Sequence, residues 1–379
     1  MLVMVVMAGP AAAQEQNPLA GSQLPFVDKI KIDRAGGVHL TKWFAVVFGG
    51  IKQGSSIALG PAVSHDFEDG SFLQVKGVYS IRHFKLLQTR YDSRPLFSGR
   101  GLVSTRLRWQ DAPELPLYAI GPDSSKAHIE YREQKSEWSG FFRYGLAPHL
   151  STTVGSGLER YELGGGVLDL DDERRLGVVP DQPGLTTRPW FVHSFASIGY
   201  DSRLSPDFSR TGTALLAGTH HYHDMEDGRG SFRGYEAGAV HLVPTFRTGN
   251  GPADWKGALS LSGRAWLTDA GEDSTVPFFL MPTLGGDFFR GYKSYRFRDR
   301  NAVLLIAEYS YAVHRMVDVA GFYEAGSVAD TARRLGGDMP QDVGGGIRVH
   351  TKTTGLMRLD LAHGRDGMHF SIGFNIAGG

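Results

Sequence analysis

Two groups of side chains in the sequence are of the types that bind metal ions. His221 and His223 end an alternating segment, and the two-residue period of a β-strand would place them on one face, about 7 Å apart. An acidic run offers carboxylates but lacks the spaced ligands and turn glycine of a calcium loop; it comprises Asp169, Asp171, Asp172 and Glu173. We expect a polar strand end and a solvated loop here, so the sequence predicts no metal and no cofactor.

Motifs of hydrolytic enzymes do not occur in the sequence. There is no Gly-x-Ser-x-Gly elbow, no His-Glu-x-x-His zinc motif and no cysteine. The runs Gly164–Gly166 and Gly344–Gly346 lack the strand-loop-helix context of a phosphate site, so we expect strand kinks or turns there. We therefore expect no enzyme. Scattered Ser, His and Asp residues leave a hydrolase at a barrel rim as a less favoured alternative.

Composition narrows the kind of chain that must position these residues. The 379 residues carry 40 Lys+Arg and 40 Asp+Glu, and a net charge of zero offers no attraction for nucleic acid. Beyond the extreme N-terminus, no apolar run approaches the roughly 18 residues of a membrane-spanning helix. The chain has 50 Gly, 22 Phe and 14 Tyr, which favours an all-β protein.

Alternation of apolar and polar residues is the dominant pattern from residue 38 onward. In Trp255–Leu267 the apolar side chains fall on one face, and Phe370, Ile372 and Phe374 do the same near the C-terminus. A soluble sandwich would have strands of about five or six residues, whereas membrane barrels need about 9 to 11. The polar faces carry charges that suit a wet lumen; these are Lys256, Arg264, Glu308, Arg348, Arg358 and Asp360. The pattern predicts a transmembrane β-barrel.

Sixteen such segments can be counted, an even number, as single-chain bacterial barrels require. They are 38–49, 54–65, 71–80, 84–91, 99–109, 128–147, 150–162, 190–202, 211–223, 231–246, 255–268, 301–312, 315–325, 343–352, 355–363 and 367–376. Long connections at 110–127, 163–189 and 269–300 are expected to be extracellular loops. Short connections, such as 147–149 and 363–367, are expected to be periplasmic turns.

Residues 1–13 have the apolar stretch and small residues of a secretory signal peptide, although no basic residue precedes Lys29. Residues 14–37 read as a short periplasmic lead-in, and residues 38–379 as the barrel. We therefore expect a protein of the bacterial outer membrane. It would contact outer-membrane lipid and depend on the cell's outer-membrane assembly machinery for its own insertion.

The loop before Asn301 and the strands after it resemble the bacterial surface antigen family. The residues concerned are Gly285-Gly286, Phe289-Arg290-Gly291-Tyr292, Glu308-Tyr309 and Phe322-Tyr323-Glu324-Ala325-Gly326. This family is the barrel module of the outer-membrane assembly factor superfamily, which includes BamA, TamA and the two-partner secretion transporters. Tyr200–Arg203 is similar to the family's junction between the eighth and ninth strands, and Leu117–Ser124 to an early family segment.

The resemblance implies a 16-stranded antiparallel barrel whose sixth extracellular loop folds back into the lumen. The arginine of its tip, Arg290, would meet the acidic residue of the motif Phe322, Glu324 and Gly326 on the thirteenth strand. An arginine suits this role because its planar fork pairs bidentately with a carboxylate. From the residues alone, Arg290 could equally cap an exposed loop. Two features depart from the family pattern: Glu324 replaces the usual aspartate, and the last strand, with Phe370, Ile372 and Phe374, continues past its usual aromatic end.

The resemblance also implies a role in assembling or translocating outer-membrane proteins or lipids. The lead-in is too short for a periplasmic POTRA domain, so the chain resembles a barrel-only form, and an unidentified periplasmic partner could supply the missing function. A passive outer-membrane pore is the main alternative, and it would need a lumen that the loop leaves open.

Overall fold

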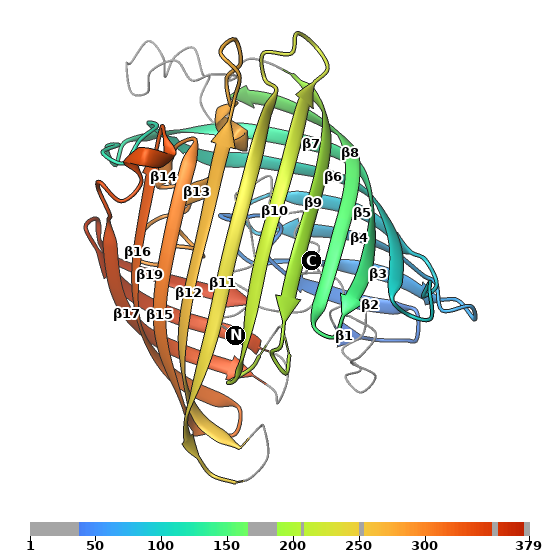
Figure 1. Cartoon of the computed structure of the whole chain (residues 1–379), viewed down its shortest axis with the longest axis vertical. Coiled ribbons are helices and arrows are strands. Elements are labelled where there is room, and N and C mark those ends of the chain that lie inside the picture. The colour runs from blue at the N-terminus through green and yellow to red at the C-terminus, as the bar shows by residue number, and fades with distance from the viewer. Residues whose placement is uncertain (1–37, 166–187, 206–207, 250–253, 351–354, 375–379) are drawn as a thin grey trace.

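The computed structural model describes residues 38–165, 188–205, 208–249, 254–350 and 355–374 (Figure 1). After a two-residue strand β1 (Val38–His39), sixteen longer strands follow in one antiparallel sheet. They are β2 (Phe44–Gly49), β3 (Ala58–Asp66), β4 (Phe72–Ser80), β5 (Lys85–Asp92), β6 (Gly101–Tyr118), β7 (His128–Ala147), β8 (Leu150–Gly165), β9 (Trp190–Asp201), β10 (Gly212–Asp224), β11 (Phe232–Arg247), β12 (Trp255–Asp269), β15 (Asn301–His314), β16 (Val317–Ala329), β17 (Gln341–His350), β18 (Gly355–Gly364) and β19 (Gly367–Phe374).

Each strand from β2 to β18 pairs antiparallel with the next long strand along the chain, which gives fifteen pairings. Figure 1 shows the resulting sheet wrapped into a barrel-shaped wall. At the seam between β19 and β2, the described residues show no paired register. The predicted fold class, an all-β barrel of sixteen antiparallel strands, is confirmed.

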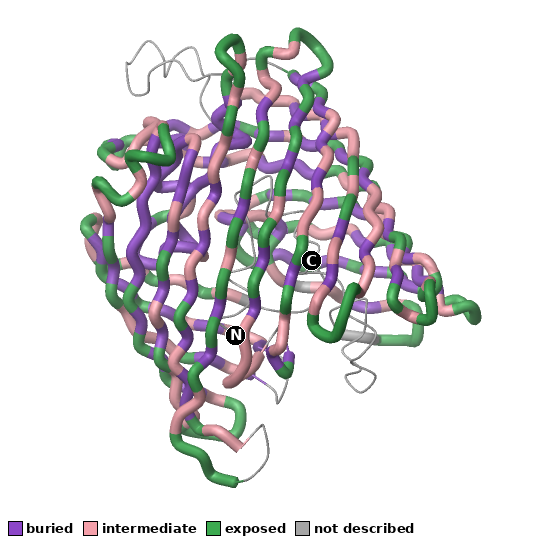
Figure 2. The backbone as a smooth tube through the Cα atoms, viewed as in Figure 1, coloured by how far each residue is buried: buried purple, intermediate pink, exposed green. Residues whose placement is uncertain are grey.

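The two faces of the wall differ in chemistry, and Figure 2 shows buried and exposed residues alternating along the strands. The outward face carries large apolar side chains, including Leu59, Leu87, Leu107, Trp138, Leu261, Leu305, Ile347, Leu361 and Phe370. The inward face carries buried polar and charged side chains, including Gln74, Glu137, Glu159, His193, Arg264, Glu308, Glu324, Arg348 and Asp360. An apolar exterior around a polar interior is the arrangement of a barrel whose outer surface faces lipid.

Among the described residues, no helix is both long and apolar enough to cross a membrane. The helical content there consists of the short 3-10 turns η2 (Phe278–Leu280) and η3 (Ala332–Arg334).

The predicted loop at 110–127 is partly wrong, because β6 continues through Tyr118. Its composition misled the prediction, since Pro113 and Glu114 have little strand propensity. The ladder accommodates them by a register shift between Ala112 and Leu115, and Arg132 on β7 holds Asp111 by two hydrogen bonds of 2.8 and 2.9 Å. The connection between β6 and β7 therefore begins only at residue 119.

The connection 363–367 was predicted to be a periplasmic turn because it is short, and this prediction is wrong. Strand directions alternate, so the turn between β18 and β19 lies at the same end of the barrel as the long connection between β12 and β15. Arg296 of that connection donates to Asp366 at 2.6 Å, and the Arg365 amide donates to the Tyr292 hydroxyl at 3.1 Å. Of the other predicted features, Asp169–Glu173 and most of the loop 163–189 lie outside the described residues, as do residues 1–37.

The outward position of β19 leads to a first prediction. Ile372 is 45% exposed on the lipid-facing side. Ile372→Arg should destabilise the barrel by about 2–4 kcal/mol if the residue lies near the bilayer midplane. The heat-induced change in gel mobility, measured against temperature in liposomes, reports this loss.

Met368 provides the matched control because it is 62% exposed on the same face of β19, next to the turn. Met368→Arg should cost only about 0–1 kcal/mol, since a charge near the interface stays close to water. Equal losses for the two variants would show that β19 does not face lipid in this way. The side chain of Phe374 and residues 375–379 lie outside the described part of the chain.

Candidate functional site

The connection between β12 and β15 turns back against the inward face of the strands. It contains η2 and a small hairpin formed by β13 (Thr283–Leu284) and β14 (Phe297–Arg298). Most of its residues from Val276 to Asp299 are buried. A loop this buried needs partners for its polar backbone and side chains, so its contacts define the candidate site.

Apolar side chains of this loop pack on two sides of the barrel interior. Phe278, Phe279 and Tyr295 belong to a cluster that includes Tyr131, Tyr161 and Phe191 of β7, β8 and β9. A second cluster joins other loop residues to strands β11, β12, β15 and β16; its loop members are Leu284, Phe288, Phe289, Tyr292 and Phe297. The loop therefore spans the interior, and burial of its aromatic rings contributes to holding it there.

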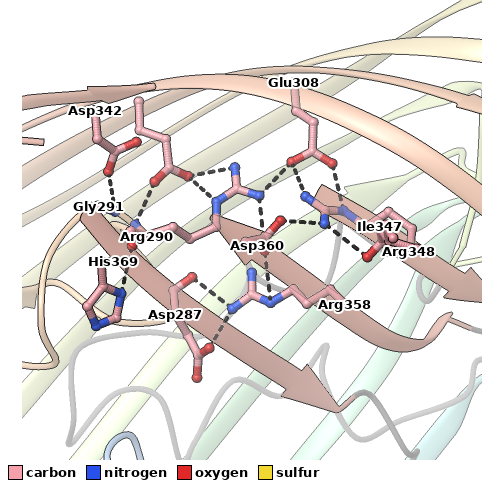
Figure 3. Close-up of polar contacts among 11 residues, drawn as sticks. Asp287, Arg290, Gly291, Glu308, Asp342, Ile347, Arg348, Arg358, Asp360 and His369 are labelled. Atoms are coloured by element: carbon pink, nitrogen blue, oxygen red, sulfur yellow. Dashed lines mark hydrogen bonds and ion pairs between the residues drawn. The ribbon is translucent and has the colours of Figure 1, made fainter. Parts of the chain in front are cut away.

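Arg290 lies at the tip of the loop and is 1% exposed (Figure 3). Its Nε donates to Glu324 Oε1 at 2.8 Å, its Nη2 lies 2.7 Å from the same oxygen, and its backbone N–H donates to Glu324 Oε2 at 2.7 Å. Its Nη1 donates to Glu308 Oε2 at 2.6 Å and lies 3.7 Å from Asp360 Oδ2. The structure thus brings Arg290 and Glu324 together, with both oxygens of the longer acid engaged.

The strands around the tip carry carboxyl groups whose hydrogen-bond donors come from the loop. Glu324 on β16 lies directly opposite Asp342 on β17. Two carboxyl groups opposite one another in a buried sheet are unfavourable unless hydrogen-bond donors compensate. The loop supplies these donors, because Arg290 bonds Glu324 and the Gly291 N–H donates to Asp342 Oδ2 at 2.6 Å.

Two arginines of the wall extend the network to β15 and β18. Arg348 donates to Glu308 at 2.9 Å and to Asp360 at 2.5 Å. Arg358 donates to Asp287 of the loop at 2.5 Å. Four wall carboxylates, on Glu308, Glu324, Asp342 and Asp360, therefore face two wall arginines, and Arg290 adds the third positive charge.

Burial by itself would lower the pKa of Arg290, but the nearby carboxylates of Glu324, Glu308 and Asp360 outweigh it. Together they raise the pKa of the guanidinium above its ordinary value. Arg290 therefore remains charged, and a buried charge of this kind is tolerated only while its partners stay in place.

The Arg290 side chain also contacts an aromatic ring. The guanidinium carbon lies 3.4 Å from the centre of the Phe322 ring, a cation–π arrangement. Phe322 itself fits because Gly344 on the next strand has no side chain; a Cβ there would lie 2.4 Å from the ring. Gly291 is similarly constrained, since a Cβ would approach the Cβ of Asp342 to 2.4 Å.

Other contacts tie the loop to elements far from β16. The side-chain amide of Gln53, between β2 and β3, donates to the Gly285 carbonyl, and the Tyr295 hydroxyl donates to the Gln53 carbonyl at 3.1 Å. Arg296 donates to Ser124 between β6 and β7, at 2.7 and 2.8 Å. On β19, His369 Nδ1 lies 3.0 Å from the Arg290 carbonyl. The loop thus contacts both sides of the seam.

Several site residues were missed or misread from the sequence. Asp342 was not singled out, because it lies just before the predicted segment 343–352, whereas β17 begins at Gln341. The run Gly344–Gly346 is not a turn, because it lies within β17. His221 and His223 are both exposed on the outward side, and Lys256 is exposed at the end of β12. Gly326 lies where a Cβ would meet Leu284 Cδ1 at 2.8 Å, so it too makes room for the loop.

Comparison with known proteins shows the fold. No family model and no curated protein matches the sequence. The structure is similar to that of BamA from Haemophilus ducreyi lacking POTRA domains 1-3, with a TM-score of 0.63, 14% identity, and coverage of 88% of this chain and 69% of that one. It is also similar to CdiB from Escherichia coli (TM-score 0.54, 14% identity) and CdiB from Acinetobacter baumannii (0.52, 12%). Each CdiB match covers 88% of this chain, which spans 62% and 59% of the two CdiB chains.

The geometry of the tip predicts strong coupling between Arg290 and its acid. Arg290→Ala leaves several buried carboxylates without their counter-charge, which should cost about 3–5 kcal/mol and free the loop. Glu324→Gln should weaken the same contact, and the double variant should lose much less than the sum of the two. Thermal unfolding in detergent, with limited proteolysis of the loop, measures both effects. Lys293→Ala is the control because Lys293 is exposed in the same loop; strictly additive losses for Arg290 and Glu324 would mean that the pair is not coupled.

The contact between Arg290 and the Phe322 ring gives a separate prediction. Gly344→Ala would place a Cβ 2.4 Å from the Phe322 ring and 2.6 Å from the Leu361 carbonyl oxygen, and should cost about 1–3 kcal/mol by overpacking. Gly321→Ala on β16 is the control, since a Cβ there meets no other atom within 4 Å. The same unfolding measurement tests the pair of variants. A barrel that tolerates both changes equally would contradict the tight contact between β17 and Phe322.

Proposed function

We propose that this chain, which has the barrel fold of BamA and CdiB, is an outer-membrane barrel of the BamA/TamA superfamily. It would take part in the assembly or translocation of outer-membrane proteins or lipids. Its Arg-Gly-Tyr loop would stay folded in the lumen while the barrel functions. The role proposed is not enzymatic.

The observation that carries the proposal is the buried tip at Arg290. The motif residues Phe289–Tyr292 and Phe322–Gly326, which resemble the surface antigen family, meet in one site with a charge network on four strands. A pore lining would need neither a buried arginine nor an aromatic core across the interior. Such a costly buried polar arrangement supports a role in which the position of the loop matters.

The same observation disfavours a passive pore. The loop packs against both aromatic clusters and is tied to Gln53, Ser124 and Asp366. This packing supports a lumen that the loop obstructs, which would disfavour steady ion flow. The outward apolar face supports residence in the outer membrane, with lipid and the cell's assembly machinery as its partners.

Reconstitution in liposomes tests the proposal. An unfolded eight-stranded outer-membrane barrel should fold into liposomes that contain this chain at least several-fold faster than into liposomes that contain an unrelated barrel of similar size. Arg290→Ala should reduce the acceleration, whereas Lys293→Ala should not. In planar bilayers the wild type should remain mostly closed. Steady conductance of the wild type, with no effect on folding of the client, would favour the passive pore instead.

A further inference from the structure

The connection between β9 and β10 lies at the opposite end of the barrel from the loop that carries Arg290, because neighbouring strands alternate in direction. In the predicted orientation this end is periplasmic. We call residues 208–211 of this connection the strap. The strap directly precedes β10, yet its side chains contact β16 and β17.

Two side chains of the strap have partners on these distant strands. Arg210 Nη2 donates to both carboxylate oxygens of Asp318, each at 2.8 Å. The Phe208 ring stacks on the imidazole of His350, with ring centres 3.9 Å apart and 14° between the planes. His350 Nε2 lies 3.0 Å from Asp318 Oδ1, and the Arg210 guanidinium lies 5.1 Å from the centre of the Phe208 ring. Asp318 and His350 therefore form one seat for the strap.

The strap cannot reach this seat along the wall. Strands β11, β12 and β15 lie between β10 and β16 in the sheet. Neighbouring strands are about 4.8 Å apart, so four steps place β16 roughly 19 Å from β10 around the wall. An arginine side chain does not span that distance. The strap must therefore leave the wall and cross the lumen in front of β11, β12 and β15.

The base of the connection is also fixed. Asp201 accepts from the Arg203 backbone N–H at 3.0 Å, and from its Nε and Nη2 at 2.8 and 2.7 Å. Gly212 has a φ of +108°, and a Cβ there would lie 2.7 Å from the Arg203 Cα. Glycine alone suits such a backbone at so close a crossing. The two ends of the connection are thus held together where the strap turns inward.

The seat matches the strap in chemistry. Asp318 and His350 are 1% and 4% exposed on the inward side of the wall. Arg348 lies directly opposite Asp318 on β17, but it donates to carboxylates of the Arg290 network. Among the described residues, Arg210 is the arginine that hydrogen-bonds Asp318. Departure of the strap would take the counter-charge from a buried carboxylate, so the seated position is favoured.

We propose that the strap is a closing device for the periplasmic mouth of the lumen. Seated on Asp318 and His350, it blocks entry from this side. Released from them, it opens the space in front of β11, β12 and β15. The two ends of the lumen are then closed by separate contacts, one at Arg290 and one at Arg210. In the assembly role proposed above, a client that enters from the periplasm would have to displace the strap first, but closure itself does not depend on that role.

Access of a thiol reagent to the lumen tests this closure. The chain has no cysteine, so Ala320→Cys is a unique reporter on the inward face of β16, two residues from Asp318. In nanodiscs, a bulky maleimide should label this reporter slowly when the strap is intact, and several-fold faster with Arg210→Ala or Phe208→Ala. Arg315→Ala is the matched control, since Arg315 is exposed in the turn between β15 and β16, and it should leave the rate unchanged.

A reporter at the other end of the lumen separates release of the strap from general loosening. Ala302→Cys on β15 serves this purpose, because Ala302 is 0% exposed and belongs to the cluster that packs against the Arg290 loop. Its labelling should stay slow in every strap variant. The inference is overturned if Arg210→Ala leaves the labelling of Ala320→Cys unchanged, or if it raises the labelling of both reporters equally.

A cross-link tests the position of the strap even if Arg210→Ala does not fold. In the folded barrel, a short bifunctional maleimide should join Phe208→Cys to His350→Cys, and the closed loop should change the gel mobility of the denatured chain. Lys256→Cys is the comparison, because Lys256 lies at the same end of β12 and would be joined instead if the strap stayed on its own side of the wall. Preferred linkage to Lys256→Cys, or none to His350→Cys, would show that the strap does not cross the lumen.

Discussion

One buried guanidinium organises the interior of this barrel. Arg290 contacts carboxylates on three wall strands and lies on the Phe322 ring. Without Arg290, the wall carboxylates would face only two arginines, Arg348 and Arg358. These carboxylates belong to Glu308, Glu324, Asp342 and Asp360. Such a network contributes little net stability compared with an apolar core of equal volume. Its effect is to define one position for the loop, because no other placement satisfies so many buried groups at once.

The same constraint applies to the barrel wall as a whole. An outer face rich in Leu, Ile, Val and aromatic side chains leaves the buried charges of the wall on the inner face, where they need partners. Two of the polar networks that meet this requirement lie around Arg290 on β15 to β18 and around His193 and His220 on β7 to β12. Between them, the aromatic residues of the loop fill the interior. Loop, wall and charges therefore depend on one another.

The sequence predicted those features that depend on neighbouring residues in the chain, and it missed those that depend on contacts between strands. Alternation acts within one strand, so it predicted all sixteen strands and the inward position of Glu308, Arg348 and Asp360. It failed where Pro113 and Glu114 form a bulge, because composition there resembles a loop. Motif order pointed to Arg290 and Glu324, but Asp342 became recognisable only through the register that places it opposite Glu324. The contacts of His193 with Glu159 and His220 became visible only in the side-chain geometry, which no sequence pattern carries.

Hydrogen exchange of the native barrel in a lipid bilayer tests the central claim most directly, because it reads the loop without altering it. The amides of Arg290 and Gly291 donate to Glu324 and Asp342 in the buried site. They should exchange as slowly as the amides of β15, at rates set by opening of the barrel itself. Exchange as fast as that of the exposed turn at residues 225–231 would contradict the account, since the loop tip would then be free of the wall.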